Sequence, residues 1–191
     1  MVRARTARGD PSLLLEDEFV VFSRELRDVD GDGAPELCAL IEHTHDAPHD
    51  IPPHLWIVQQ GRLLLDLWLP DANGFATTTH APLQFSAGKA PLGVFIPSSL
   101  GVSGFTQMPH AFIWSTTKFK AVPFKQIDKH LASAGKLQLS KDGGLNVRTN
   151  RDVSVYDKVS DDPTKPYVRQ VFRYQNGTLV GDKATLGRTH P

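Results

Sequence analysis

The sequence has too few cysteines, and apolar runs too short, for a disulfide-rich or membrane-spanning protein. Cys38 is the only cysteine among 191 residues, so the chain cannot form an internal disulfide. No apolar run approaches the roughly 20 residues that a membrane-spanning helix needs. The basic N-terminus is followed by only Leu13 to Leu15, which is shorter than the apolar core of a signal peptide. Cys38 lies among apolar neighbours, which predicts a buried thiol without a catalytic role.

Catalytic motifs are scarce as well. The pattern S-x-x-K begins at Ser86, Ser115 and Ser133, but neither S-D-N nor K-T-G accompanies it, as a β-lactamase-type site would require. The segment from Gly101 to Phe105 begins like the G-x-S-x-G motif of a nucleophile elbow, but Phe105 stands in place of the last glycine. No Walker-type phosphate loop occurs. These absences favour a binding or structural protein over an enzyme.

The net charge is zero, but the charge is unevenly distributed. Residues 1–116 hold 7 basic and 14 acidic residues, whereas residues 117–191 hold 14 basic and 7 acidic ones. A nucleic-acid-binding protein usually concentrates its basic residues in a patch with aromatics. Here they are spaced along apparent strands, which indicates a solvated face and no nucleic-acid partner. The alternative is a basic face that binds an anionic partner.

The chain is rich in turn-forming residues, with 14 prolines and 15 glycines, and its short strand-like segments predict an all-β fold. We expect mainly antiparallel, propeller-like or sandwich-like sheets with one short helix. The expected domain is residues 16–182, between an irregular arm over residues 1–15 and a tail over residues 183–191. The helix is expected from Pro123 to Ala134, where Phe124, Ile127 and Leu131 would share one face.

Turn signals place three hairpins in the predicted sheets. One turns at Gln60-Gly61 within residues 55–69, a second at Lys141–Gly144, and a third at Asn176-Gly177, where Asn-Gly favours a type I′ turn. Further strands are expected at residues 92–96, 110–116 and 153–156, and residues 70–91 read as a loop.

The most informative segment is R-D-V-D-G-D-G-A-P-E-L, from Arg27 to Leu37. Carboxylates at alternate positions of a tight loop can surround a calcium ion, which takes six to eight oxygen ligands. Gly33 at the sixth loop position permits the sharp turn. An EF-hand would need a bidentate glutamate at the twelfth position, which is Ala39 in this chain. The sequence therefore predicts a calcium loop between two strands, at residues 18–27 and from Leu37 onward.

This run, D-x-D-G-D-G-x-x-E-L followed by a hairpin, resembles the calcium loops of FG-GAP/VCBS repeats, the blades of integrin-α-type β-propellers. The resemblance covers residues 18–69. It implies calcium ligands at five loop positions: the side chains of Asp28, Asp30, Asp32 and Glu36 and the backbone carbonyl of Ala34. Because the chain carries one such loop and family members carry several, a small propeller-like or sandwich-like domain is expected, without the full set of blades.

A second group of potential ligands follows in a proline-rich connection. Four histidines and two aspartates occur within twelve residues: His43, His45, Asp46, His49, Asp50 and His54. His43 and His45 would point the same way on a strand and could share Zn²⁺ or Cu²⁺ with His49 or His54. The simpler interpretation is a solvated polar loop.

We therefore expect a non-enzymatic, calcium-stabilised β domain that binds a protein or surface glycan and has no membrane span. Millimolar calcium would keep a weak site filled in the periplasm or outside the cell. Small bacterial proteins with one such loop include inhibitors and immunity proteins of cell-wall hydrolases, which the resemblance offers as a class. Two alternatives stay open: a metal-dependent hydrolase that uses the loop from His43 to His54, and a structural subunit of a larger assembly. The sequence does not indicate the oligomeric state.

Overall fold

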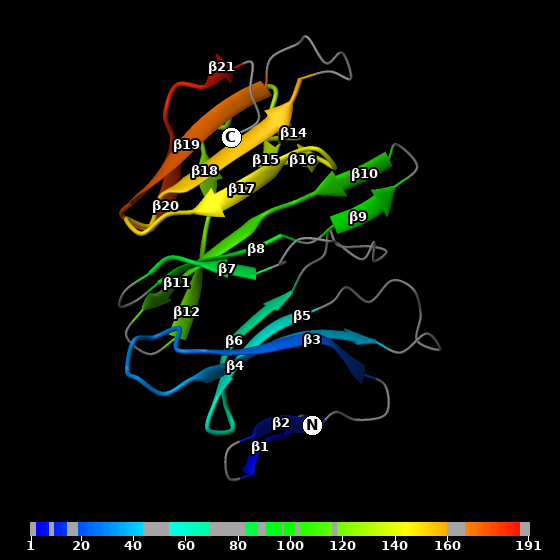
Figure 1. Cartoon of the computed structure of the whole chain (residues 1–191), viewed down its shortest axis with the longest axis vertical. Helices are drawn as coiled ribbons and strands as arrows, with labels where there is room; N and C mark the ends of the chain where they lie inside the picture. The colour runs from blue at the N-terminus through cyan, green and yellow to red at the C-terminus, as the bar shows by residue number, and fades with distance from the viewer. Residues whose placement is uncertain are drawn as a thin grey trace.

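The computed structural model describes residues 3–7, 10–14, 19–43, 54–68, 83–87, 91–96, 98–101, 104–115, 118–159 and 167–187. This part of the chain is all-β, with 66% strand and no helix, and its sheets are not closed into a barrel. Figure 1 shows the sheets stacked along the long axis, with the N-terminal hairpin at one end and the C-terminal sheet at the other. The prediction of an all-β, mainly antiparallel fold is confirmed.

The first layer is a four-stranded antiparallel sheet in the order β3-β4-β5-β6. Its strands are β3 (Phe19–Arg27), β4 (Glu36–His43), β5 (His54–Gln59) and β6 (Arg62–Trp68). Gln60 and Gly61 join β5 to β6 with φ angles of 46° and 83°. Two positive φ angles are the mark of a type I′ turn, so the hairpin predicted at this dipeptide is confirmed. The hairpin β1 (Arg3–Ala7) and β2 (Asp10–Leu14) precedes this sheet.

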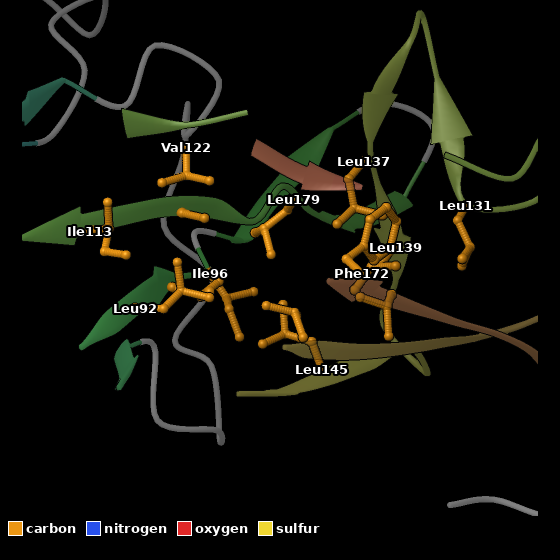
Figure 2. Packing of buried hydrophobic residues seen from close by; sticks show 14 of the residues in the cluster. Leu92, Ile96, Ile113, Val122, Leu131, Leu137, Leu139, Leu145, Phe172 and Leu179 are labelled. Atoms are coloured by element: carbon orange, nitrogen blue, oxygen red, sulfur yellow. The ribbon is translucent and has the colours of Figure 1, made fainter. Parts of the chain in front are cut away.

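The middle layer is a four-stranded sheet in the order β12-β11-β8-β7. Its strands are β7 (Leu83–Phe85), β8 (Leu92–Phe95), β11 (His110–Ser115) and β12 (Lys118–Val122). Both faces of this sheet contribute to a hydrophobic core, and Lys118, Lys120 and Ala121 of the edge strand β12 are exposed. Four phenylalanines pack towards the first layer, namely Phe85, Phe95, Phe112 and Phe119. The alternate residues join the larger core on the other side, which Figure 2 shows around Leu92, Ile113 and Val122.

The third layer is the C-terminal sheet, in the order β13-β20-β19-β18-β17 with β21 paired to β19. Its strands are β13 (Phe124–Lys125), β17 (Gly144–Val147), β18 (Val153–Lys158), β19 (Tyr167–Gln175), β20 (Thr178–Gly181) and β21 (Thr185–Gly187). The predicted turn at Asn176-Gly177 is confirmed, with φ angles of 49° and 80°. Smaller sheets are made by β9 (Ser98–Gly101), β10 (Gly104–Gln107) and β16 (Leu139–Ser140), and by β14 (Ala132–Ser133) with β15 (Lys136–Leu137).

The helix expected from Pro123 to Ala134 is wrong. Phe124 and Lys125 instead form a parallel pair with β20, and the carbonyl of Pro123 accepts a hydrogen bond of 2.9 Å from the amide of Leu179. The side chains of Phe124, Ile127 and Leu131 do face the core, as the 3-4 spacing suggested, but from a strand and turns. Pairing with β20 satisfies backbone groups that a helix would have used internally.

Other local expectations also differ from the structure. The turn at Lys141–Gly144 forms, but β16 pairs with β10 and β17 pairs with β18, so no hairpin spans it. Within the expected irregular arm, Arg3–Ala7 and Asp10–Leu14 pair as antiparallel strands, although neither segment has the alternating apolar pattern that predicts a strand. Thr185–Gly187 of the expected tail pair with β19, and residues 83–85 of the expected loop form β7. The division into one domain with an arm and a tail otherwise stays a prediction.

Candidate metal centre

The predicted calcium loop connects β3 to β4, and its aspartates fold it. Asp28 accepts hydrogen bonds from the backbone amides of Gly31, at 2.7 Å, and Gly33, at 3.0 Å. Gly31 and Gly33 have φ angles of 78° and 90°, a region that glycine occupies without strain. Asp30 and Asp32 likewise accept from amides two residues ahead, at 3.0 and 2.7 Å. These side-chain turns give the loop its shape and leave further carboxylate lone pairs for other partners.

Glu36 anchors the end of the loop. It is the first residue of β4 and is 0% exposed, which is rare for a glutamate. Its Oε2 accepts a hydrogen bond of 2.7 Å from the backbone amide of Val29. Val29 is also 0% exposed and packs in the core between the first two layers. The loop is therefore fixed at both ends, one through an apolar side chain and the other through a buried carboxylate.

The fold brings three of these carboxylates together. One oxygen from each of Asp28, Asp30 and Glu36 lies within 4.8 Å of the others. The four acidic side chains of the loop, those of Asp28, Asp30, Asp32 and Glu36, form no ion pair with any described lysine or arginine. Oxygen-rich clusters of this kind suit a hard cation such as Ca²⁺.

Gln59, at the end of β5, completes the group and was not identified from the sequence. Its Nε2 donates to Glu36 Oε1 at 2.8 Å, and it lies 3.1 Å from Asp32 Oδ2 and 3.3 Å from Asp30 Oδ2. An NH₂ group carries two hydrogens, so the two longer contacts share one donor. Pairing of Leu37 with Val58 places the start of β4 beside the end of β5. Only that register shows that Gln59 approaches the loop.

The surroundings of the cluster disfavour the ionised form of two of its carboxyl groups, those of Glu36 and Asp30. Burial is the main cause that raises the pKa of Glu36 above 4.5, and the negative charges of Asp30 and Asp32 raise it further. Burial likewise raises the pKa of Asp30, with added repulsion from Asp32 and Asp28. A carboxyl whose ionised form is disfavoured in this way gains most from a nearby cation.

The four side chains among the five predicted ligands are thus arranged in two groups. Asp28, Asp30 and Glu36 converge, whereas Asp32 lies beside them and reaches the cluster through Gln59. The amide of Ala34 donates to Asp32 at 2.7 Å, which fixes the peptide after the loop's last glycine. Cys38, two residues beyond Glu36, is buried as predicted, and burial raises the pKa of its thiol far above the ordinary value.

The histidine loop falls largely outside the described residues. This applies to His45, Asp46, His49 and Asp50, and to the side chain of His43. His54 is described: its Nδ1 lies 2.6 Å from Asp66 Oδ1, which also accepts a hydrogen bond of 3.0 Å from Trp56 Nε1. This contact ties β5 to β6 and engages one of the two ring nitrogens that a metal could use.

Comparisons with protein-family models, curated proteins and solved structures found no match. The resemblance to FG-GAP/VCBS calcium loops therefore stays a prediction from the residues of the loop. Among the described residues, no helix is long and apolar enough to cross a membrane.

Proposed function

We propose that the loop from Asp28 to Glu36 binds Ca²⁺ and that the ion stabilises a non-enzymatic β domain whose role is to bind a protein or surface glycan. The observation that carries the calcium site is the convergence of Asp28, Asp30 and the fully buried Glu36 within 4.8 Å. Like charges at this separation repel one another, and a divalent cation would convert the repulsion into attraction.

Gln59 would act as a fifth side chain of the site. Its NH₂ group lies against three carboxylates, those of Asp30, Asp32 and Glu36. A half-turn of the terminal amide exchanges Nε2 for Oε1, and amide oxygens are ordinary calcium ligands. The bound ion would then link the β3–β4 loop, the start of β4 and the end of β5. Its binding free energy would become part of the folding free energy of the first layer.

The partner-binding role is proposed from the motifs of the sequence. The sequence offers no complete catalytic motif, and the acidic loop joins two strands of the first layer, where a bound ion would have a structural role. An extracytoplasmic location is proposed because millimolar calcium there would fill even a weak site. Inhibition of, or immunity to, a cell-wall hydrolase is the role that the loop's family resemblance offers for such a domain.

The calcium site is tested by thermal unfolding of the wild type in Ca²⁺, in Zn²⁺ and in chelator, beside Asp30→Ala and the control Asp142→Ala. Asp142 is an acidic residue of the β16–β17 turn, remote in sequence from the loop. At calcium about 100-fold above the dissociation constant, the wild type gains about 2.7 kcal/mol. Asp30→Ala is expected to lose this gain, and Asp142→Ala to keep it. A wild type that melts at the same temperature in Ca²⁺ and in chelator would refute the calcium site.

A further inference from the structure

A feature that the calcium loop does not explain is a pocket of about 330 Å³ at one end of the middle layer. It lies where β11 begins and β12 ends, since Ala111 pairs with Val122 there, and Leu67 of β6 and the β14–β15 hairpin complete its wall. The volume lies at the lower end of the range of small-molecule sites, roughly 300–1,000 Å³. An apolar cavity of about 150 Å³ takes up benzene, so this pocket has room for a molecule of about two fused rings.

The wall of this pocket is apolar. The only polar side chains among its lining residues are those of His110 and Lys136. Both already take part in an interaction with another group, and the ligand proposed below needs neither. The largest apolar lining residues are only half-buried, namely Leu67, Met108, Phe124 and Ile127. Large apolar side chains that surround one hollow and still face solvent are typical of a binding site, because an apolar ligand would bury them.

The floor of the pocket belongs to the hydrophobic core. Val122 and Leu137, which line it, are 4% exposed and are part of the core cluster of Figure 2. The ring of Phe124 packs edge-to-face against the fully buried ring of Phe172, with the two ring centroids 5.1 Å apart. Phe124 is therefore held from the core side. A ligand would enter a wall that is already formed, which reduces the entropy lost on binding.

Two of the lining side chains favour an aromatic ligand over an aliphatic one. The polarisable thioether of Met108 makes favourable contacts with aromatic rings. The ring of Phe124 can pair with a ligand ring as it already pairs with Phe172. We propose that this pocket binds a free, uncharged aromatic molecule of about two fused rings. The rings would lie against Met108, Phe124 and Ile127, and the site is independent of the calcium loop.

The test uses indole, an uncharged bicyclic aromatic molecule, as the probe, and 1-hexanol as an aliphatic comparator of similar hydrophobicity. The chain holds two methionines, Met1 and Met108. Methyl-¹³C-methionine labelling therefore gives one NMR signal at the pocket and one reference signal elsewhere. Titrated indole is expected to shift the Met108 signal in a saturable way, with a dissociation constant of about 0.1–1 mM, and to leave Met1 unchanged. Hexanol is expected to bind at least about threefold more weakly, because it gains neither the sulfur–ring nor the ring–ring contact.

Two variants and a control locate the binding. Ala121 and Lys120 are neighbouring exposed residues of β12, and of the two only Ala121 lines the pocket. Ala121→Trp is expected to weaken indole at least about tenfold, because its ring takes space that the ligand would occupy, whereas Lys120→Trp is expected to change the affinity less than about twofold. Phe124→Leu keeps an apolar wall but removes the ring, so it is expected to weaken indole about threefold and hexanol less than about twofold. If a variant does not fold, the comparison of indole with hexanol on the wild type decides.

Several results would overturn the proposal. One is a Met108 signal that does not respond to indole, or does not saturate, at about 10 mM. Another is equal affinity for indole and hexanol, since the pocket would then not select an aromatic ring. Equal losses in Ala121→Trp and Lys120→Trp would place the binding elsewhere. A tryptophan-containing tripeptide that binds at least about tenfold more tightly than indole would assign the pocket to a side chain of a protein partner.

Discussion

Gln59→Glu provides the sharpest test of the acidic cluster because it changes one group and keeps the shape of the side chain. In the wild type Nε2 lies 2.8 Å from Glu36 Oε1 and 3.1 Å from Asp32 Oδ2. The variant places a carboxylate oxygen where that donor now lies. Without calcium it should destabilise the fold, and with calcium it should bind the ion more tightly than the wild type, because ligand charge raises calcium affinity.

The size of the calcium-free effect follows from two terms. A hydrogen bond to a charged group contributes about 1.5–3 kcal/mol. The new carboxylate also repels the acidic side chains around it. This repulsion cannot cost more than protonating one carboxyl would, which for an ordinary pKa at about pH 7 is about 3.7 kcal/mol. The terms overlap, because a protonated carboxyl can itself donate to Glu36. We therefore expect a loss of about 2–4 kcal/mol in the free energy of unfolding.

Urea denaturation in chelator and in saturating Ca²⁺ measures both effects. Gln175→Glu, at the exposed end of β19, is the matched control for the change of amide to carboxylate. The control is expected to lie within about 0.5 kcal/mol of the wild type in both conditions. If Gln59→Glu is as stable as the wild type in chelator, the described contacts of Gln59 do not stabilise the loop. If calcium stabilises the variant no more than the wild type, Gln59 is not beside the ion.

Three further predictions concern the loop and the middle layer. Asp30→Ala should weaken calcium binding more than Asp32→Ala in a calorimetric titration, because only Asp30 of the two belongs to the converging group; equal losses would contradict the geometry. Burial raises the pKa of Glu36 above 4.5, so at a pH between the unfolded and folded pKa values the folded state holds a proton that the unfolded state has released. In chelator, the free energy of unfolding should therefore fall as pH rises from about 4.5 through the raised pKa of Glu36, and calcium affinity should rise over the same range. Thermal melts of the wild type and Glu36→Gln across this range measure the change in stability. An identical pH dependence in both proteins would refute the prediction. Gly93→Ala should destabilise the fold by about 1–3 kcal/mol in urea denaturation, because a Cβ there would overlap the Phe112 ring; no change would mean that the ring moves freely.

The elements that could be predicted from sequence are those whose signal is local. The turns at Gln60-Gly61 and Asn176-Gly177 follow from residues that tolerate positive φ, and β8, β11 and β18 follow from short apolar or alternating runs. The loop's acidic residues were likewise visible as spacing, and the fold brings three of them together.

The elements that could not be predicted depend on partners distant in the chain. Phe124 to Leu131 carry a helical spacing, yet Phe124 and Lys125 pair in parallel with β20, about 55 residues further along the chain, and the residues after them form turns. Such tertiary contacts override local propensity. Gln59 was missed for the same reason: it is an ordinary polar residue before a turn until the register of β4 and β5 places it 2.8 Å from Glu36.

The buried position of Glu36 makes the acidic loop more than a surface turn. Three aspartates folded by their own amide contacts would form an exposed Asx-rich loop with or without an ion. Glu36 is different, because its burial carries a cost that one amide of Val29 and one donor of Gln59 offset only in part. Replacing Glu36 with leucine would leave the buried amide of Val29 without its acceptor, at a cost of about 1–3 kcal/mol in chelator whether or not the loop binds an ion. The response to calcium therefore separates the two roles: a turn gives no calcium response in the wild type or in Glu36→Leu, whereas a calcium site gives a response in the wild type that Glu36→Leu loses.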